Sequence, residues 1–343
     1  MGDYLLFLAK TVTVLLAVAL ALGVTAGLVF RLAGAGRRQA PRPSLRVTEV
    51  GSRYDKLARD LRSGMVPAGA LRAERRRRNR EDKARRMGEA RAASQGEKPP
   101  KPRVFVLSFH GDVRASRVSA LREEVTAILM VANDDDEVVV KLQNPGGLVN
   151  DQGLAASQLL RLRDHAIPLT VAVDTVAASG GYMMACVADR IIAAPFAVVG
   201  SIGVVTQIPN FHRLLDRFGV DVEQFTGGRY KRTVTMLTPT TDEAREKLKE
   251  QIEDTHDLFK EFVADHRPQL DLERVATGEY WYGARAIELG LVDELRTSDD
   301  YLVAARERAD IYEVSYRQPV GMRDRLLGLA GRVAGTSGLQ GVR

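Results

Sequence analysis

A serine set among small residues, Ser179, has the sequence surroundings of a nucleophile. The apolar run before it, 168–173, predicts a buried strand, and 182–187 predicts the start of a helix. The first N–H groups of a helix have no partner within the helix and favour negative charge. An attacking serine, and the oxyanion that its attack creates, would be stabilised at such a turn. The alternative is a helix-capping serine beside glycines that allow close packing.

A second glycine turn is expected to face this serine. Residues 144–147 are Asn-Pro-Gly-Gly and follow a predicted strand at 138–142. Ligand sites of open α/β sheets lie beyond the carboxyl ends of the strands, so the two turns should meet. The N–H groups of Gly147 and Gly180 would then form an oxyanion hole. An ordinary proline–glycine turn is the other interpretation of this stretch.

A serine nucleophile also needs a group that takes its proton. Histidine is the usual choice, and His110 is the hardest of the histidines to dismiss because it ends the first predicted strand of the body. No carboxylate partner for His110 is evident in the sequence. The remaining histidines are expected at helix ends or on the surface: His165, His212, His256 and His266.

Lysine is the second candidate base, and Lys231 follows a glycine turn in Gly-Gly-Arg-Tyr-Lys. A lysine of ordinary pKa is protonated at neutral pH, so Lys231 would have to be enclosed beside hydroxyl groups for its pKa to fall. Ser201, in Gly-Ser-Ile-Gly, could supply such a hydroxyl and orient the neutral amine. A solvated loop lysine and a plain turn serine are the alternatives.

The composition sets limits on the class of protein. The 343 residues suffice for one or two domains with a core. Cys186 is the single cysteine, so an internal disulfide is excluded, and its apolar surroundings predict a small core residue. The sequence has no Walker loop and no ligand-spaced histidine–cysteine cluster, so no cofactor or metal is expected. The net charge of +6 is unevenly distributed along the chain. Residues 31–103 carry +14, from 22 basic and 8 acidic residues, whereas residues 104–343 carry about −8.

The N-terminal part predicts attachment to a membrane. Residues 11–30 carry no charge and are long enough to cross a bilayer core of about 30 Å. We predict a retained transmembrane anchor at 1–32 rather than a cleaved signal peptide, which has a basic start and a shorter apolar core. Arginines follow this run closely, and the positive-inside rule then puts the remaining chain on the cytoplasmic side of the inner membrane.

A polar, basic spacer, helical or disordered, is predicted at 33–102, and the Lys-Pro-Pro-Lys-Pro of 98–102 ends it. Four consecutive arginines at 75–78 could bind nucleic acid. No aromatic residues interleave with them to stack on bases, so nucleic acid is not the expected partner. The anionic headgroups of the lipid bilayer are the favoured alternative.

Alternating strands and helices predict an α/β body at 103–300 with a mainly parallel sheet. The predicted strands are 104–109, 138–142, 169–173 and 190–193, and the predicted helices are 118–131, 153–163, 181–188 and about 241–265. The C-terminal tail, 301–343, has little pattern and receives no role.

Three short motifs, in this order and spacing, resemble signal peptide peptidase A and its relatives. They are Ala-Ala-Ser-Gly-Gly-Tyr at 177–182, Gly-Ser-Ile-Gly at 200–203 and Gly-Arg-Tyr-Lys at 228–231. The resemblance extends from the anchor to about residue 300 and includes Trp-Tyr-Gly at 281–283. Lys231 follows Ser179 by 52 residues, and this spacing resembles that of the single-unit members of the family.

The resemblance implies a crotonase-like βαβ superhelix, shared with Clp protease, in which a Ser–Lys dyad cleaves peptide bonds. It implies that Ser179 is the nucleophile, Lys231 the general base and Ser201 the group that holds the lysine. It further implies that Gly147 and Gly180 donate to the oxyanion. Members of the family form homo-oligomeric rings, and the dyad can be completed across a subunit interface.

These features together predict a membrane-anchored serine endopeptidase that acts on signal-peptide remnants or membrane-associated polypeptides. A crotonase-like body could instead hydrate or isomerise acyl-CoA, but such enzymes usually use carboxylates where this chain has a serine and a lysine. A non-enzymatic membrane scaffold would suit the anchor and the spacer, but it has no need of Lys231.

Overall fold

The computed structural model describes residues 43–65 and 101–317, together with isolated residues within 10–23 and 76–91. Contacts between residues group 45–316 into one compact unit. The predicted anchor, most of the predicted spacer and residues 318–343 lie outside the described residues. Within the described part of the chain, no helix has both the length and the apolar character that a bilayer crossing requires.

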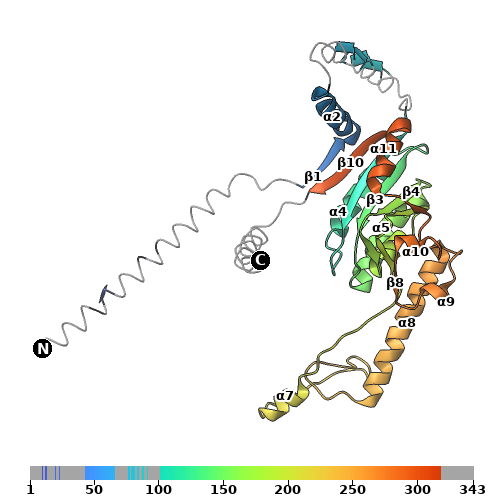
Figure 1. The fold of residues 1–343 in the computed structure, drawn as a ribbon. Helices are drawn as coiled ribbons and strands as arrows, with labels where there is room; N and C mark the ends of the chain where they lie inside the picture. Colours follow the sequence, from blue (N-terminus) through green and yellow to red (C-terminus); the bar gives the residue numbers. More distant parts are fainter. Residues whose placement is uncertain are drawn as a thin grey trace. The chain divides into compact units, whose positions relative to one another are not determined.

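A seven-stranded sheet forms the centre of the unit (Figure 1). From β10 to β9 every neighbouring pair of strands is parallel. The carboxyl ends of these strands therefore lie along one edge, where the loops that follow them meet. In spatial order the strands are β1 (Ser44–Glu49), β10 (Asp310–Arg317), β2 (Arg103–His110), β3 (Glu137–Gln143), β4 (Leu169–Val173), β6 (Arg190–Ala193) and β9 (Glu294–Leu295).

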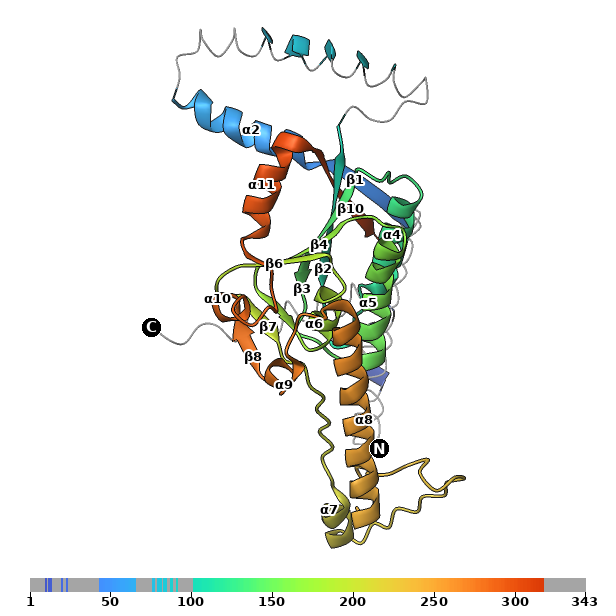
Figure 2. The same cartoon turned by 90° about the vertical axis from the view of Figure 1, so that its right-hand side faces the viewer.

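Helices cover both faces of this sheet, as Figure 2 shows. Alternate residues of one strand point to opposite faces, so Phe105 and Leu107 of β2 belong to one apolar core and Val104 and Val106 to the other. The larger core includes residues of α4 (Val118–Leu129), α5 (Val149–Asp164), α6 (Gly180–Ala185) and α8 (Asp242–His266). The smaller core includes residues of α2 (Val50–Ser63) and α11 (Ser298–Arg308).

The strands predicted from 104 to 193 are confirmed within one residue, and α4 and α8 are confirmed within two. The other two predicted helices are also present, but α5 begins four residues before the predicted start and α6 ends three residues before the predicted end. The sheet also extends into both flanking segments. β1 comes from the stretch expected as a spacer, and β10 comes from the expected tail and lies between β1 and β2. The buried Ile311 and Val314 of β10 are three residues apart and belong to different cores, so the strand lacks the regular alternation by which a strand is predicted.

A second, three-stranded sheet stands at the carboxyl end of β3. It consists of β5 (Val176–Ala178), β7 (Val198–Gly200) and β8 (Tyr280–Tyr282), with β5 parallel to β7 and β7 antiparallel to β8. A parallel bridge between Asn144 and Ala177 connects it to the residues that follow β3. The strand before Ser179 is thereby attached to the loop that contains the Asn-Pro-Gly-Gly turn. Two short helices, α9 (Leu272–Val275) and α10 (Gly283–Ala286), flank β8 in the chain.

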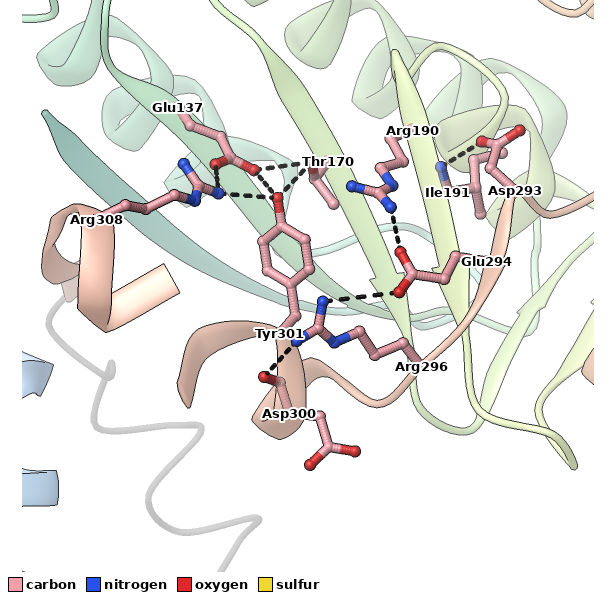
Figure 3. Close-up of polar contacts among 10 residues, drawn as sticks. All are labelled: Glu137, Thr170, Arg190, Ile191, Asp293, Glu294, Arg296, Asp300, Tyr301 and Arg308. Atoms are coloured by element: carbon pink, nitrogen blue, oxygen red, sulfur yellow. Dashed lines mark hydrogen bonds and ion pairs between the residues drawn. The ribbon is translucent and has the colours of Figure 1, made fainter. Parts of the chain in front are cut away.

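Polar contacts fix the C-terminal elements to the smaller-core face of the sheet (Figure 3). Glu137, at the start of β3, is 8% exposed and accepts a hydrogen bond from the Tyr301 hydroxyl of α11. It also accepts from Thr170 at 2.9 Å and from Arg308 at 2.7 Å. In the same view Arg190 of β6 pairs with Glu294 of β9. A buried carboxylate is costly unless it is paired and hydrogen-bonded, so we assign this cluster to the attachment of α11.

Candidate active site

Ser179 occupies the turn between β5 and α6, as the sequence predicts. Its backbone has φ 52° and ψ −120°, a left-handed conformation that a residue with a Cβ rarely adopts. Such strain costs on the order of 1–3 kcal/mol and persists only where the surroundings fix it. Here the Ser179 N–H donates to the Gly200 carbonyl at 2.8 Å, and the Ser179 carbonyl accepts from Met183 at 3.0 Å. The turn holds one half-buried hydroxyl-bearing side chain outside the apolar core.

The Asn-Pro-Gly-Gly loop lies directly against this serine. A methyl group on Gly146 would stand 2.8 Å from Ser179 Cβ, and Gly146 has φ 96°, so a side chain is excluded on both counts. A methyl group on Gly147 would stand 2.2 Å from the Val113 carbonyl oxygen. The predicted meeting of the two loops is therefore confirmed, and the loop that follows β2 joins them.

Two backbone donors are available at this junction. Within residues 101–317 the N–H groups of Gly147 and Gly180 donate no hydrogen bond to the protein. Gly180 begins α6, where the N–H groups have no intrahelical acceptor. The N–H groups of both glycines are therefore available to a negatively charged oxygen.

Ser201 lies one residue beyond the carbonyl that holds Ser179. It also has a positive φ, 51°, and its N–H donates to the Glu279 carbonyl at 2.7 Å. The Trp281 ring packs on Gly200 so closely that a methyl group there would lie 2.8 Å from a ring carbon. The structure thus brings Ser179, Ser201 and both glycine turns to one place.

Lys231 is not part of this cluster in the single chain. It is exposed and lies within residues 205–241, which we call the arm and which include α7 (His212–Arg217). The turn before Lys231 is held on the first turn of α8, where Glu243 accepts from Arg229 at 2.9 Å and from Tyr230 at 3.3 Å.

The length of α8 separates the arm from the serine. Glu243 and the buried Phe259 are 16 residues apart on α8 (259 − 243), which is about 24 Å along the helix axis. Phe259 belongs to the same core as α6, the helix that follows Ser179. In both Figure 1 and Figure 2 α7 lies beside the end of α8 that is far from α6. Ser179 and Lys231 of one chain therefore make no contact.

Within the described residues no histidine is hydrogen-bonded to Ser179. His110 ends β2 with an exposed side chain, opposite Gln143 of β3. Nδ1 of His165 contacts the Arg161 carbonyl at the end of α5, and Nδ1 of His266 contacts the Phe262 carbonyl at the end of α8. These two residues have the helix-end positions that the sequence predicts.

Behind the serine, α6 is buried through all of its residues. The Tyr182 hydroxyl donates to the Leu291 carbonyl at 3.0 Å, so the one polar group of this side chain is satisfied. Burial raises the pKa of the Cys186 thiol to about 12. Cys186 is thus a protonated core residue, as predicted, and not a second nucleophile.

Two buried amides were not singled out from the sequence. Asn144 and Gln152 are both fully buried, and Asn144 Nδ2 donates to Gln152 Oε1 at 2.8 Å. Gln152 falls at a core-facing position of α5, where a polar residue is unusual. That position is the signal by which it could have been found.

Gly181→Ala should destabilise the protein by about 1–3 kcal/mol, because a methyl group at this position would lie 2.0 Å from the backbone oxygen of Asn144. The matched control is Gly153→Ala in α5, where the nearest heavy atom would be the Met183 sulfur at 3.9 Å. Removing a helical glycine there should raise stability by up to about 1 kcal/mol. Thermal melting of both variants checks the pair, and equal melting temperatures would show that the contact at Gly181 is not rigid.

The fold and the site define an α/β protein in which a strained serine at a strand–helix turn faces a glycine loop. Residues 161–312 match the profile of Peptidase family S49, and residues 1–159 match the profile of Peptidase family S49 N-terminal. The chain belongs to peptidase family S49.

Individual relatives agree with this membership. The chain is 56% identical over 214 residues to "Probable protease SohB" of Haemophilus influenzae, covering 62% of this chain and 61% of the relative. It is 52% identical over 216 residues to "Probable protease SohB" of Buchnera aphidicola, covering 63% and 64%. The matches thus span less than two thirds of either relative.

Among solved structures, a mutant of the 1510-N membrane-bound stomatin-specific protease in complex with a substrate peptide is similar at a TM-score of 0.43 and 13% identity. The match covers 67% of this chain and 98% of that one.

Proposed function

We propose that this chain is a serine endopeptidase that hydrolyses peptide bonds through an acyl-enzyme. The observation that carries the proposal is the strained Ser179, held at the start of α6 with Gly146 packed against its Cβ. Membership of peptidase family S49 supports the same reaction class. A residue in a sparsely populated conformation at a loop junction is a frequent property of active sites.

The proposed roles follow from the chemistry of acyl transfer. Ser179 Oγ attacks the peptide carbonyl while the neutral amine of Lys231 takes the hydroxyl proton. The N–H groups of Gly147 and Gly180 stabilise the oxyanion, and collapse of the intermediate transfers the proton to the leaving amine. Water then attacks the ester with the same lysine as base, which releases the acid and restores the serine. Ser201, next to Gly200, orients the lysine amine.

We further propose that Lys231 acts on the serine of a neighbouring copy in a homo-oligomeric ring. The 24 Å or so of α8 between its core contact and Glu243 supports this arrangement, because the arm cannot reach the serine of its own chain without leaving α8. The arm also exposes many large apolar side chains, which a second copy would cover. They are Val205, Phe211, Leu214, Phe218, Val220, Val222, Phe225, Tyr230, Met236 and Leu237.

We also propose a particular fold and a location for this chain. The parallel ladders, and the small sheet attached to the end of β3, support a crotonase/Clp protease-like superhelix of βαβ units. The uncharged run at 11–30 supports an N-terminal anchor in the inner membrane with the body on the cytoplasmic side. Signal-peptide remnants and other membrane-associated polypeptides are then the substrates nearest to the site.

The test uses the purified full chain in detergent micelles with denatured casein and a synthetic signal peptide as substrates. Wild type should cleave and should gain the mass of a fluorophosphonate probe, whereas Ser179→Ala should do neither and should melt as wild type does. Ser157→Ala, an exposed serine that donates to the Gly153 carbonyl in α5, is the matched control and should behave as wild type. Cleavage by Ser179→Ala at the wild-type rate would overturn the assignment, and a wild type that binds peptide without cleaving would favour a scaffold.

A further inference from the structure

A chain of buried side-chain amides connects two of the three loops that meet at Ser179, the Asn-Pro-Gly-Gly loop and the loop that follows β2. Its first link is the Gly146 N–H, which donates to Asn144 Oδ1 at 2.9 Å. Its second is Asn144 Nδ2, which donates to Gln152 Oε1 at 2.8 Å. Its third is Gln152 Nε2, which donates to the Asp112 carbonyl at 3.0 Å.

The chain has a fixed direction because both of its ends are backbone groups. The Gly146 N–H can only donate, so the oxygen of the Asn144 amide must face it. The Asp112 carbonyl can only accept, so the nitrogen of the Gln152 amide must face that end. The two amides can then meet in one orientation, nitrogen of Asn144 to oxygen of Gln152. Turning either amide over would place two acceptors or two donors together.

Packing fixes the same residues sterically. A methyl group on Gly180 would lie 2.4 Å from Gln152 Cγ, so α6 begins in direct contact with this side chain. The second N–H of Asn144 Nδ2 points to the Met184 sulfur at 3.2 Å, within α6. Gln152 therefore contacts the first residue after the nucleophile and, through Asn144, holds the glycine turn.

We infer that Gln152 is a positioning residue that holds the Gly146–Gly147 turn and the start of α6 in register with Ser179. The inference rests on the proposed function for its catalytic consequence, although the hydrogen-bond chain exists independently of it. Gln152 touches neither the nucleophile nor the lysine, and it acts through Asn144 and the Asp112 loop. The interior of α5 thus determines where the oxyanion donors stand.

The decisive substitution is Gln152→Glu, which preserves size but replaces the donor that faces the Asp112 carbonyl. An ionised carboxyl there would place two acceptors, the carboxylate and the Asp112 carbonyl, next to each other. The resulting repulsion would release the Gly146–Gly147 turn. A protonated carboxyl could still accept from Asn144 and donate to Asp112, and burial raises the pKa of such a group toward neutrality or above. The activity relative to wild type should therefore depend on pH in a manner that a general loss of stability would not produce.

The matched control lies on the same helix. Gln158 is also buried, but its amide nitrogen donates to the Leu154 carbonyl at 3.4 Å and its oxygen accepts from Arg161 at 3.1 Å. Gln158→Glu retains the acceptor for Arg161 and makes no contact with the three loops. It should follow wild type at every pH.

Peptide hydrolysis by the full chain in micelles, measured from pH 6 to pH 10, tests the inference. At alkaline pH, Gln152→Glu should lower kcat roughly 10- to 100-fold, with KM within about twofold of wild type. The ratio to wild type should rise as the pH falls and the introduced carboxyl takes a proton. A Gln152→Glu variant that follows Gln158→Glu throughout would overturn the inference.

Two further measurements cover the remaining outcomes. If Gln152→Glu does not fold, Gln152→Met removes both hydrogen bonds at similar volume, and a folded Gln152→Met with wild-type kcat would overturn the inference. If wild type itself does not hydrolyse peptide, the proposed function fails, and amide hydrogen exchange of residues 144–148 still decides the positioning role. Faster exchange in Gln152→Glu but not in Gln158→Glu supports the role, and equal exchange overturns it.

Discussion

Two inactive variants, Ser179→Ala and Lys231→Ala, should regain peptidase activity when their subunits assemble together. Each variant alone should be at background, because one lacks the nucleophile and the other lacks the base. In a mixed ring some interfaces pair an intact Ser179 with an intact Lys231 from the neighbouring copy. The structural reason is the position of Lys231 on the arm, beside Glu243 at the end of α8 that is far from α6.

The expected activity follows from the fraction of subunit interfaces that contain both an intact Ser179 and an intact Lys231. In a one-to-one mixture with random assembly, half of the copies carry an intact serine and half of their neighbours carry an intact lysine. About one quarter of the interfaces are then complete, and activity should reach about one quarter of the wild-type value. Co-expression of the two variants at equal levels gives the unselected sample for the peptide assay, and a different affinity tag on each variant confirms that mixed assemblies form.

The matched control replaces one parent with the double variant Ser179→Ala/Lys231→Ala. Mixtures of Ser179→Ala with this double variant contain no intact serine and should remain at background. Mixed assemblies of the two single variants that also remain at background would show that the dyad forms within one chain. The arm would then have to fold back and release the contact of Arg229 with Glu243.

The sequence predicts the nucleophile turn well because its determinants are local. A buried strand, a turn of small residues and a helix follow one another in about 20 residues, and Ser179 stands where this order places it. The meeting of Ser179 with the Gly146–Gly147 turn is also predictable, since parallel strands bring their carboxyl ends to one edge.

Non-local features are harder to predict. The partner of Gln152 is Asn144, but their pairing depends on the orientation of α5 against the sheet rather than on either residue's neighbours in the chain. The spacing between Ser179 and Lys231 does not reveal that α8 carries the lysine away from the core. β10 lies between β1 and β2, which come from the N-terminal half of the chain. Such a position in the sheet produces no pattern in the local sequence of β10.

Asp293→Ala should destabilise the protein by about 3–5 kcal/mol, because it would leave a buried arginine charge without its partner. Arg267 is 4% exposed and donates to both carboxylate oxygens of Asp293, at 2.9 Å and 2.6 Å. Burial by itself lowers the pKa of Arg267, and the hydrogen bonds and charge of Asp293 raise it above its ordinary value. Asp293 also accepts from the Ile191 N–H of β6 at 2.7 Å, a contact drawn in Figure 3.

The melting temperature should fall by roughly 6–20 °C for a unit of this size. The control is Glu288→Ala, which breaks an exposed ion pair with Arg285 at 3.5 Å and should shift stability by less than about 1 kcal/mol. A melting temperature of Asp293→Ala within two or so degrees of that control would contradict the prediction. Removing both charges with Arg267→Met/Asp293→Asn, which keeps an acceptor for the Ile191 N–H, should recover much of the loss.

This ion pair also bears on the proposed site, because Arg267 is the C-cap of α8. The buried Phe259 and Val263, together with Arg267, fix one end of the helix to the core, and the other end holds the arm through Glu243. A helix fixed at one end transmits a small tilt at its base into a large displacement at its tip, since the lever is about 24 Å long. Asp293→Ala assayed well below its melting temperature should therefore lose kcat that the Glu288→Ala control retains. A folded Asp293→Ala with wild-type kcat would show that α8 is held by its apolar contacts alone.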